Sequence, residues 1–242
     1  MLEKTSTRLA ATVFILAGLA NIPAHAQDWT GFYLGAHGGY GDGSGTHSIV
    51  TDAFGFLNAP FGPNISGTFV GGQVGYDHQV SNWVVGVNGE INASWIDGVF
   101  DNNPPGNDDV YQTDVQWFGS VRGRLGFVPP SAQSLMVFAT GGLAFAEIEA
   151  SNGDGLNGSF GQLDTRQATG SATEVGYTLG AGAAWMPPIQ VFNTANIVFI
   201  AEYAYYDFGN VRINTVRETG ATHIFDVDAD FHTGRFGVAL KF

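Results

Sequence analysis

The chain has 242 residues, a net charge of -13, no cysteine and 13% charged residues, about half the share of roughly 25% that is usual in globular domains. These values exclude a basic nucleic-acid-binding surface, disulfide bonds and thiolate metal sites. The 35 glycines and the 13% of aromatic residues instead favour a strand-rich chain whose outer surface meets lipid.

The N-terminus carries the features of an export signal. A basic start precedes an apolar run at 9–20, and an A-x-A cleavage motif ends at Ala26. The apolar run is too short for a transmembrane helix, which needs about 20 apolar residues. We therefore expect 1–26 to be a cleaved signal peptide and 27–242 to form the mature barrel domain.

Apolar and polar residues alternate with a period of two in eight stretches of the mature chain. The clearest is the third, in which Trp83, Val85 and Val87 alternate with Gly86, Asn88 and Glu90. This period indicates extended strands with two unlike faces. The stretches lie at about 29–41, 69–80, 83–95, 115–127, 135–145, 173–186, 197–208 and 231–242.

The connections between these stretches alternate in length. Long segments rich in Gly, Asn, Ser and acidic residues lie at 42–66, 97–112, 150–172 and 209–229, and short turns lie at 81–82, 128–134 and 187–196. Outer-membrane barrels have short periplasmic turns and longer extracellular loops. The sequence therefore predicts an all-β fold: an eight-stranded antiparallel transmembrane β-barrel with four long, acidic extracellular loops.

The last strand ends on an aromatic residue with no polar tail after it. Phe236, Val238, Leu240 and Phe242 form its apolar face. We expect this face to be the signal through which the outer-membrane assembly machinery recognises the chain.

The polar faces of the strands place eight charged residues inside the barrel. They are Asp77, Glu90, Arg122, Arg124, Glu174, Glu202, Arg235 and Lys241. An eight-stranded barrel is just wide enough to be filled by side chains, and buried charges must be paired to be tolerated. We expect Glu90 and Glu202 to meet Arg122 and Arg124 near mid-barrel and to plug it. The alternative is a gated path for small ions along the same residues.

Aromatic residues occur at the ends of the outward faces, as expected of the girdles at the two membrane interfaces. Those near the short turns are Trp83, Phe127 and Trp185, and those towards the long loops are Trp95, Trp117, Tyr177, Tyr203 and Tyr205.

Six short motifs, in order along the mature chain, resemble a known family. They are 28–35 (DWTGFYLG), 121–126 (VRGRLG), 138–144 (FATGGLA), 180–182 (GAG), 201–209 (AEYAYYDFG) and the terminal Lys241-Phe242. Together they resemble the small porin-like outer-membrane barrels of alphaproteobacteria. The resemblance implies an abundant surface barrel, and members of that family are described as surface antigens, porins or haem binders. The chain departs from the family pattern at Ala184, where a Glu is common, and in its longer turn at 187–196.

The residues and the resemblance together predict a structural protein of the Gram-negative outer membrane that maintains the envelope and presents surface loops. The alternatives are a porin for ions or small solutes, a barrel that binds haem or a host ligand through loop residues such as His47 and His223, and a lipid A-modifying enzyme that uses His232. A soluble lipocalin-like carrier would need the opposite arrangement of polar and apolar faces.

We expect no enzymatic activity, because no histidine lies in a recognisable Ser/His motif. We also expect no cofactor, no metal and no nucleic-acid partner. The expected partners are outer-membrane lipid, lipopolysaccharide and the assembly machinery.

Overall fold

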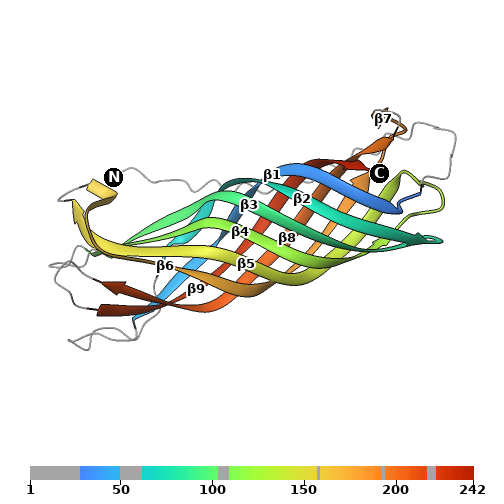
Figure 1. The fold of residues 1–242 in the computed structure, drawn as a ribbon. Coiled ribbons are helices and arrows are strands. Elements are labelled where there is room, and N and C mark those ends of the chain that lie inside the picture. The colour runs from blue at the N-terminus through green and yellow to red at the C-terminus, as the bar shows by residue number, and fades with distance from the viewer. Residues whose placement is uncertain (1–27, 50–61, 103–108, 157–158, 192–193, 217–221) are drawn as a thin grey trace.

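The computed structural model describes residues 28–49, 62–102, 109–156, 159–191, 194–216 and 222–242 (Figure 1). The predicted signal peptide, 1–26, lies outside the described residues. Among the described residues, no helix has the length and apolar character needed to cross a membrane. The strands are β1 (Gly31–Ile49), β2 (Asn64–Val80), β3 (Trp83–Asn102), β4 (Asp109–Phe127), β5 (Leu135–Leu156), β6 (Ser159–Trp185), β7 (Gln190–Val191), β8 (Ala195–Val216) and β9 (Thr222–Lys241).

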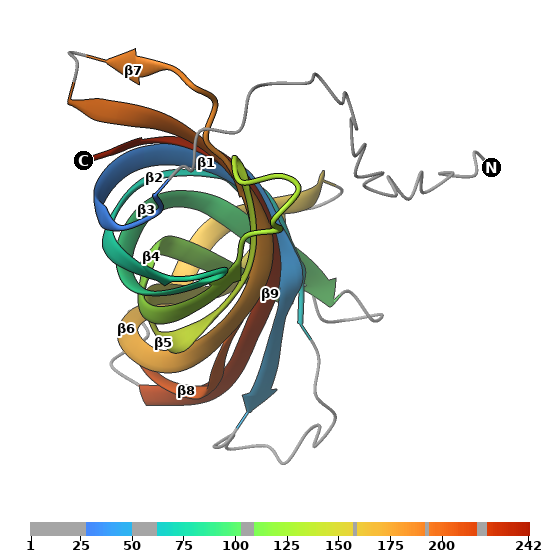
Figure 2. The same ribbon diagram turned by 90° about the vertical axis from the view of Figure 1, so that its right-hand side faces the viewer.

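Eight of these strands close into an antiparallel barrel, which Figure 2 shows nearly end-on. Each long strand pairs with its neighbours in sequence, and β6 pairs with β8. The last strand returns to the first, so that Leu34 of β1 lies between Val74 of β2 and Leu240 of β9. The remaining strand, β7, lies outside the barrel wall. It has two residues, pairs only with β8, and forms a small ribbon in the connection at 187–196. The predicted eight-stranded fold is confirmed.

The alternation of residues sets the two faces of the barrel wall. On β3, Val87 and Ile91 are 61% and 64% exposed, whereas Asn88 and Glu90 between them, and Asn92 after them, are buried. A chain with apolar side chains on the outside of a closed sheet, and with its backbone groups paired around the ring, meets the conditions for crossing a bilayer with strands.

The predicted alternation of faces breaks near the start of the fourth stretch, on β4. Continued from the outward Trp117, it would place Val115 outside and Gln116 inside, but Val115 is 1% exposed and Gln116 is exposed. The pairing register shifts between Val115 and Trp117, and between Ala93 and Ile96 on β3. An additional residue at such a bulge reverses the faces of the residues beyond it.

The strands also run further than the sequence predicted. Much of the segments expected as long loops is strand: β6 has 27 residues and begins at Ser159, within the expected loop 150–172. About 9–11 residues suffice for a tilted strand to cross the membrane. The turns at the other end are short: Val80 pairs with Trp83 across Ser81-Asn82, with Ser81 at a φ of 57°. The additional strand length therefore projects from the end opposite these turns.

Candidate functional site

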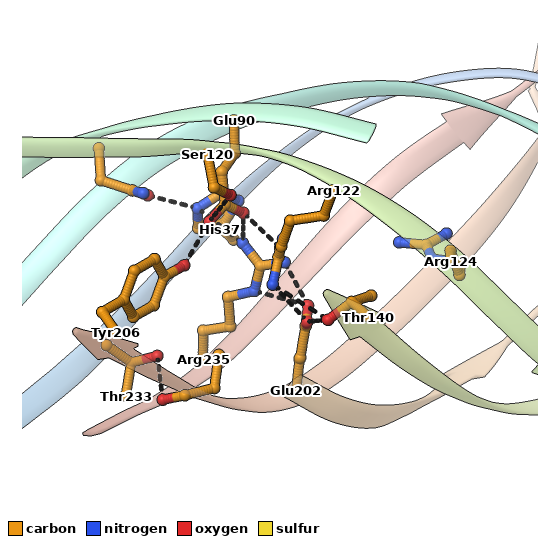
Figure 3. Close-up of polar contacts among 12 residues, drawn as sticks. His37, Glu90, Ser120, Arg122, Arg124, Thr140, Glu202, Tyr206, Thr233 and Arg235 are labelled. Atoms are coloured by element: carbon orange, nitrogen blue, oxygen red, sulfur yellow. Dashed lines mark hydrogen bonds and ion pairs between the residues drawn. The ribbon is translucent and has the colours of Figure 1, made fainter. Parts of the chain in front are cut away.

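The centre of the barrel holds a quartet of buried charges, Glu90 on β3, Arg122 on β4, Glu202 on β8 and Arg235 on β9 (Figure 3). The guanidinium of Arg122 donates to Glu90 at 2.8 Å and to Glu202 at 2.7 Å. Arg235 also donates to both carboxylates, with Nε 3.0 Å from Glu202 Oε2. The quartet is electrically neutral, and each charge meets two opposite charges, which offsets the cost of burying it.

Neutral polar groups complete the hydrogen bonding of the quartet. Ser120 Oγ donates to Glu90 at 3.0 Å, and the Tyr206 hydroxyl donates to the same oxygen. Thr140 Oγ1 donates to Glu202 at 2.8 Å. His37 contacts Asn92 at 2.6 Å beside Arg235. These bonds tie the quartet to the surrounding strands.

The quartet lies between two apolar layers that also fill the interior. On the side of the extended strands, the ring of Phe118 packs against the rings of Phe69, Tyr206 and Phe231 at centroid distances of 5.1–5.2 Å. Towards the short turns, a second cluster contains Trp29, Met136 and Met186, all 0–1% exposed. Side chains thus fill the interior, which is apolar on the side of the extended strands and combines an apolar cluster with the charged side chains of Asp77, Arg124 and Lys241 on the side of the short turns.

Trp29 links the cluster near the short turns to the neighbouring strands and turns. Its indole Nε1 donates to the carbonyl of Gln133 at 3.1 Å, in the turn between β4 and β5. Its backbone N–H donates to the side chain of Gln79 on β2 at 2.8 Å. The start of the described chain is thereby tied to two other elements.

Arg124 does not join the central quartet, contrary to the prediction. Its guanidinium lies away from the quartet (Figure 3), 3.5 Å from Asp77 Oδ2. Lys241 Nζ contacts the same oxygen at 2.9 Å. The position assigned to Arg124 is occupied by Arg235, which comes from the last strand. The second charged group, Asp77, Arg124 and Lys241, lies in the half of the barrel nearer the short turns, beside Tyr33 and Phe138.

The remaining predicted residues divide between the interior and the wall. Glu174 is only half-buried, and it takes part in none of the ion pairs found among the described residues. The four apolar residues of the last strand lie together on the outer face: Phe236, Val238, Leu240 and Phe242. Their role in assembly stays a prediction.

Several residues of the network were not singled out from the sequence. Tyr206, Ser120, Thr140 and His37 all lie on the inner face by alternation, so their positions could have been identified. Their hydrogen-bond partners could not have been identified, because alternation shows which face of a strand a residue lies on but not the register in which neighbouring strands pair.

A belt of aromatic and acidic side chains lies on the outer surface towards the long connections, and includes Tyr177, Tyr203, Asp207 and His232. The Tyr203 hydroxyl lies 2.7 Å from His232 Nδ1, and the hydroxyl of Tyr177 donates to Asp207 at 2.8 Å. Beyond this belt, burial and the carboxylates of Asp207 and Asp230 raise the pKa of Asp228 above its ordinary value. The belt has the composition of an interfacial girdle.

Three histidines were considered for catalysis or haem binding, and the structure describes the side chain of one of them. His232 bonds to Tyr203 on the outer surface. His47 and His223 are placed on β1 and β9, but their side chains lie outside the described part of the structure. No group of three His, Cys, Asp or Glu side chains within the described residues could hold a metal ion.

Comparisons with known proteins agree with this architecture. The family model described as Outer membrane protein beta-barrel domain matches residues 12–242. The 31 kDa outer-membrane immunogenic proteins of Brucella melitensis biotype 1 and Brucella suis biovar 1 are each 31% identical over 229 residues, covering 91% of this chain and 86% of the relative. The outer membrane protein OprG from Pseudomonas aeruginosa has a similar fold, with a TM-score of 0.53 at 13% identity, covering 88% of this chain and 96% of OprG.

Proposed function

The chain belongs to the family of outer-membrane β-barrel proteins, and we propose that it acts there as a closed structural barrel that maintains the envelope and presents its extended strands and loops at the cell surface. The outer membrane is its location, and its fold crosses that membrane with strands. The proposal concerns what the barrel does once it is inserted.

The observation that carries the proposal is the filling of the interior. A solute or ion that crossed the barrel would have to pass the Phe118 layer, the neutral quartet and the Trp29 cluster in succession. The quartet offers no net charge to attract an ion, and both of its carboxylates are engaged by two arginines. The Phe118 layer on one side, and the Trp29 cluster around Asp77, Arg124 and Lys241 on the other, add the cost of stripping water from any ion that leaves the quartet.

Planar-bilayer conductance tests this proposal. We expect the wild-type protein to give no steady current, and we expect the same of Glu90→Ala and Arg122→Ala, because each leaves both apolar layers in place. Val121→Ala, a lipid-facing neighbour of Arg122, is the matched control variant. A general porin in the same bilayer shows that insertion can be detected. Large steady currents from the wild-type protein would contradict the closed barrel.

A surface role is supported by the length of the strands and by the relatives. With 27 residues, β6 is more than twice the roughly 11 needed to cross the membrane, so much of it is available outside. The Brucella relatives are named as immunogenic outer-membrane proteins. We propose that the projecting strands of this chain are likewise a surface antigen, and antibodies raised against the folded barrel are expected to label intact cells.

We infer that the barrel is not an enzyme. The hydrogen bonds of His37 and His232 in the described structure are with Asn92, Arg235 and Tyr203, and none is with a serine hydroxyl. Incubation with lipid A followed by mass spectrometry tests this inference, and loss of an acyl chain would contradict it.

A further inference from the structure

The connection between β6 and β8 contains a short paired ribbon, unlike the other two short turns, 81–82 and 128–134. In this ribbon β7 and the start of β8 run antiparallel, and the N–H of Ile197 donates to the carbonyl of Ile189 at 3.2 Å. The ribbon stands out to the side of the barrel wall and does not cover the mouth of the barrel (Figure 1 and Figure 2). It therefore lies beside the barrel at the level of the short turns, where the membrane surface surrounds the wall.

The two faces of this ribbon differ in character. Gln190 pairs with Asn196 and Val191 pairs with Ala195, and paired residues lie on the same face. The period of two then gives an apolar face of Ile189, Val191, Ala195 and Ile197, and a polar face of Gln190, Thr194 and Asn196. Ile189 is 50% exposed and Val191 is partly exposed, whereas Ala195 is buried. The ribbon is thus amphipathic, and the barrel leaves much of its apolar face uncovered.

The ribbon also lies in an uncharged part of the chain. No charged residue or histidine occurs between Glu174 and Glu202, although the chain has a net charge of -13. Such an element can rest on lipid without an ionic group having to lose its water. The other two short turns, 81–82 and 128–134, expose no large apolar side chain. An exposed and uncharged apolar face therefore distinguishes the ribbon from the other short turns.

The apolar face continues the lipid-facing surface of the wall. The ring of Phe199 stacks between Trp185 at 5.6 Å and Phe236 at 6.2 Å, all on the outer face. Ile197 precedes Phe199 by two residues on β8, so it lies on the same face. Because the ribbon bends away from the barrel (Figure 2), the face that continues the outside of the wall turns towards the membrane.

We propose that the apolar face of this ribbon lies on the phospholipid leaflet at the end of the short turns, with the side chain of Ile189 inserted below the headgroups. The short turns of outer-membrane barrels are periplasmic, so this leaflet is the periplasmic one. The contact lies on one side of the barrel only, and it fixes the depth and tilt of the wall on that side. The contact is independent of whether the interior is closed.

The absence of cysteine allows a single label to be placed on either face of the ribbon. Ile189→Cys labels the apolar face, and Gln190→Cys, the next residue on the polar face, is the matched control. Each variant carries the same environment-sensitive fluorophore and is reconstituted in phosphatidylcholine vesicles, with or without a nitroxide quencher on the upper acyl chain. Quenching is expected to be at least about twofold greater at position 189, because interfacial amphipathic elements bury their apolar face about 5–10 Å deep.

The gel shift between unboiled and boiled samples shows that each labelled barrel is folded before quenching is measured. Equal quenching at the two positions, or quenching of position 189 by aqueous iodide but not by lipid, would overturn the proposal. Protection of position 189 that requires a periplasmic extract would show that a protein covers the ribbon, and would overturn it as well. The contrast is expected to persist when anionic phosphatidylglycerol is added, because the ribbon has no charge, and a contrast confined to anionic vesicles would contradict the proposed contact.

Discussion

The carboxylate of Glu202 shows how strongly a single side chain depends on its neighbours in this barrel. It is 4% exposed and accepts hydrogen bonds from Arg122, Arg235 and Thr140. Arg122 and Arg235 are themselves only 1% and 7% exposed, so little water reaches them when this carboxylate is removed. The effect of a substitution here therefore depends on which charges remain.

We expect Glu202→Gln to destabilise the barrel by about 3–5 kcal/mol, because two buried arginines are left with one carboxylate. Removing one charge of each sign, in Glu202→Gln with Arg235→Met, is expected to recover much of that loss. Urea unfolding in detergent measures both effects. Tyr203→Phe, on the outer face of the same strand, is the control and is expected to cost about 0.5–1.5 kcal/mol. A double variant as unstable as the sum of the two single variants would contradict this account.

The sequence predicted correctly that Glu90 and Glu202 meet Arg122, but it assigned Arg124 to them in place of Arg235. Glu90, Arg122, Glu202 and Arg235 were all placed inside by alternation. Arg124 was assigned to the wrong partner because both arginines face inward two residues apart on β4, and only the stagger between strands decides which one is level with Glu202. That stagger is a property of the closed sheet and has no local sequence signal.

At the scale of the strand, close backbone approach limits what the wall can carry beside the quartet. Gly180 on β6 lies opposite the bond between Thr140 and Glu202. A Cβ atom at this position would lie 2.8 Å from Glu202 Oε1 and 2.8 Å from Thr140 Oγ1. The absence of a side chain at Gly180 thus leaves room for a hydrogen bond between two other strands.

Gly180→Ala is expected to destabilise the barrel by about 1–3 kcal/mol, because the added methyl group displaces polar atoms that are bonded to Arg122. Gly123→Ala is the matched control. It lies on the outer face of β4, where a Cβ would have its nearest heavy atom, Gly141 O, at 3.8 Å, and its effect is expected to stay within about 0.5 kcal/mol. Equal urea midpoints for the two variants would show that the crowding at Gly180 is relieved at no cost.

Strand positions were predictable from the sequence to different degrees at the two ends of the barrel. Where one face meets lipid, the apolar alternation marks each strand, and the short turn at Ser81-Asn82 was identified from the sequence. Towards the other end the sequence shows no apolar alternation, and segments such as 159–172 read as loops although β6 includes them. The bulge at Gln116 was missed because it is a shift in the pairing register of β4 with β3 and β5, and the alternation within one strand does not show such a shift.

At the scale of the whole molecule, the last strand completes the barrel. β9 pairs with both β1 and β8, and the N–H of Phe242 donates to the carbonyl of Phe32 at 2.8 Å. The chain therefore cannot close until its final residues are in place. Their outward apolar side chains are also available for recognition before closure.

Deletion of Phe242 is expected to lower the fraction of the protein that reaches the outer membrane in folded form, because it removes both a closing hydrogen bond and an exposed aromatic side chain. Phe242→Tyr keeps both features and is expected to assemble as the wild type does. Unboiled and boiled samples of outer-membrane fractions, run on the same denaturing gel, measure the folded fraction. Normal assembly of the truncated chain would refute a role for this residue.

The projecting ladder of β5 and β6 has a consequence for immune recognition. Glu149 pairs with Ser171 and Ala150 pairs with Gly170, so residues about 20 positions apart in the chain are direct neighbours. An antibody that binds across this ladder contacts both strands at once, and its epitope is discontinuous. Such an antibody would recognise the native cell but neither a linear peptide nor a blot of boiled protein, and a vaccine antigen based on this chain would have to be supplied folded.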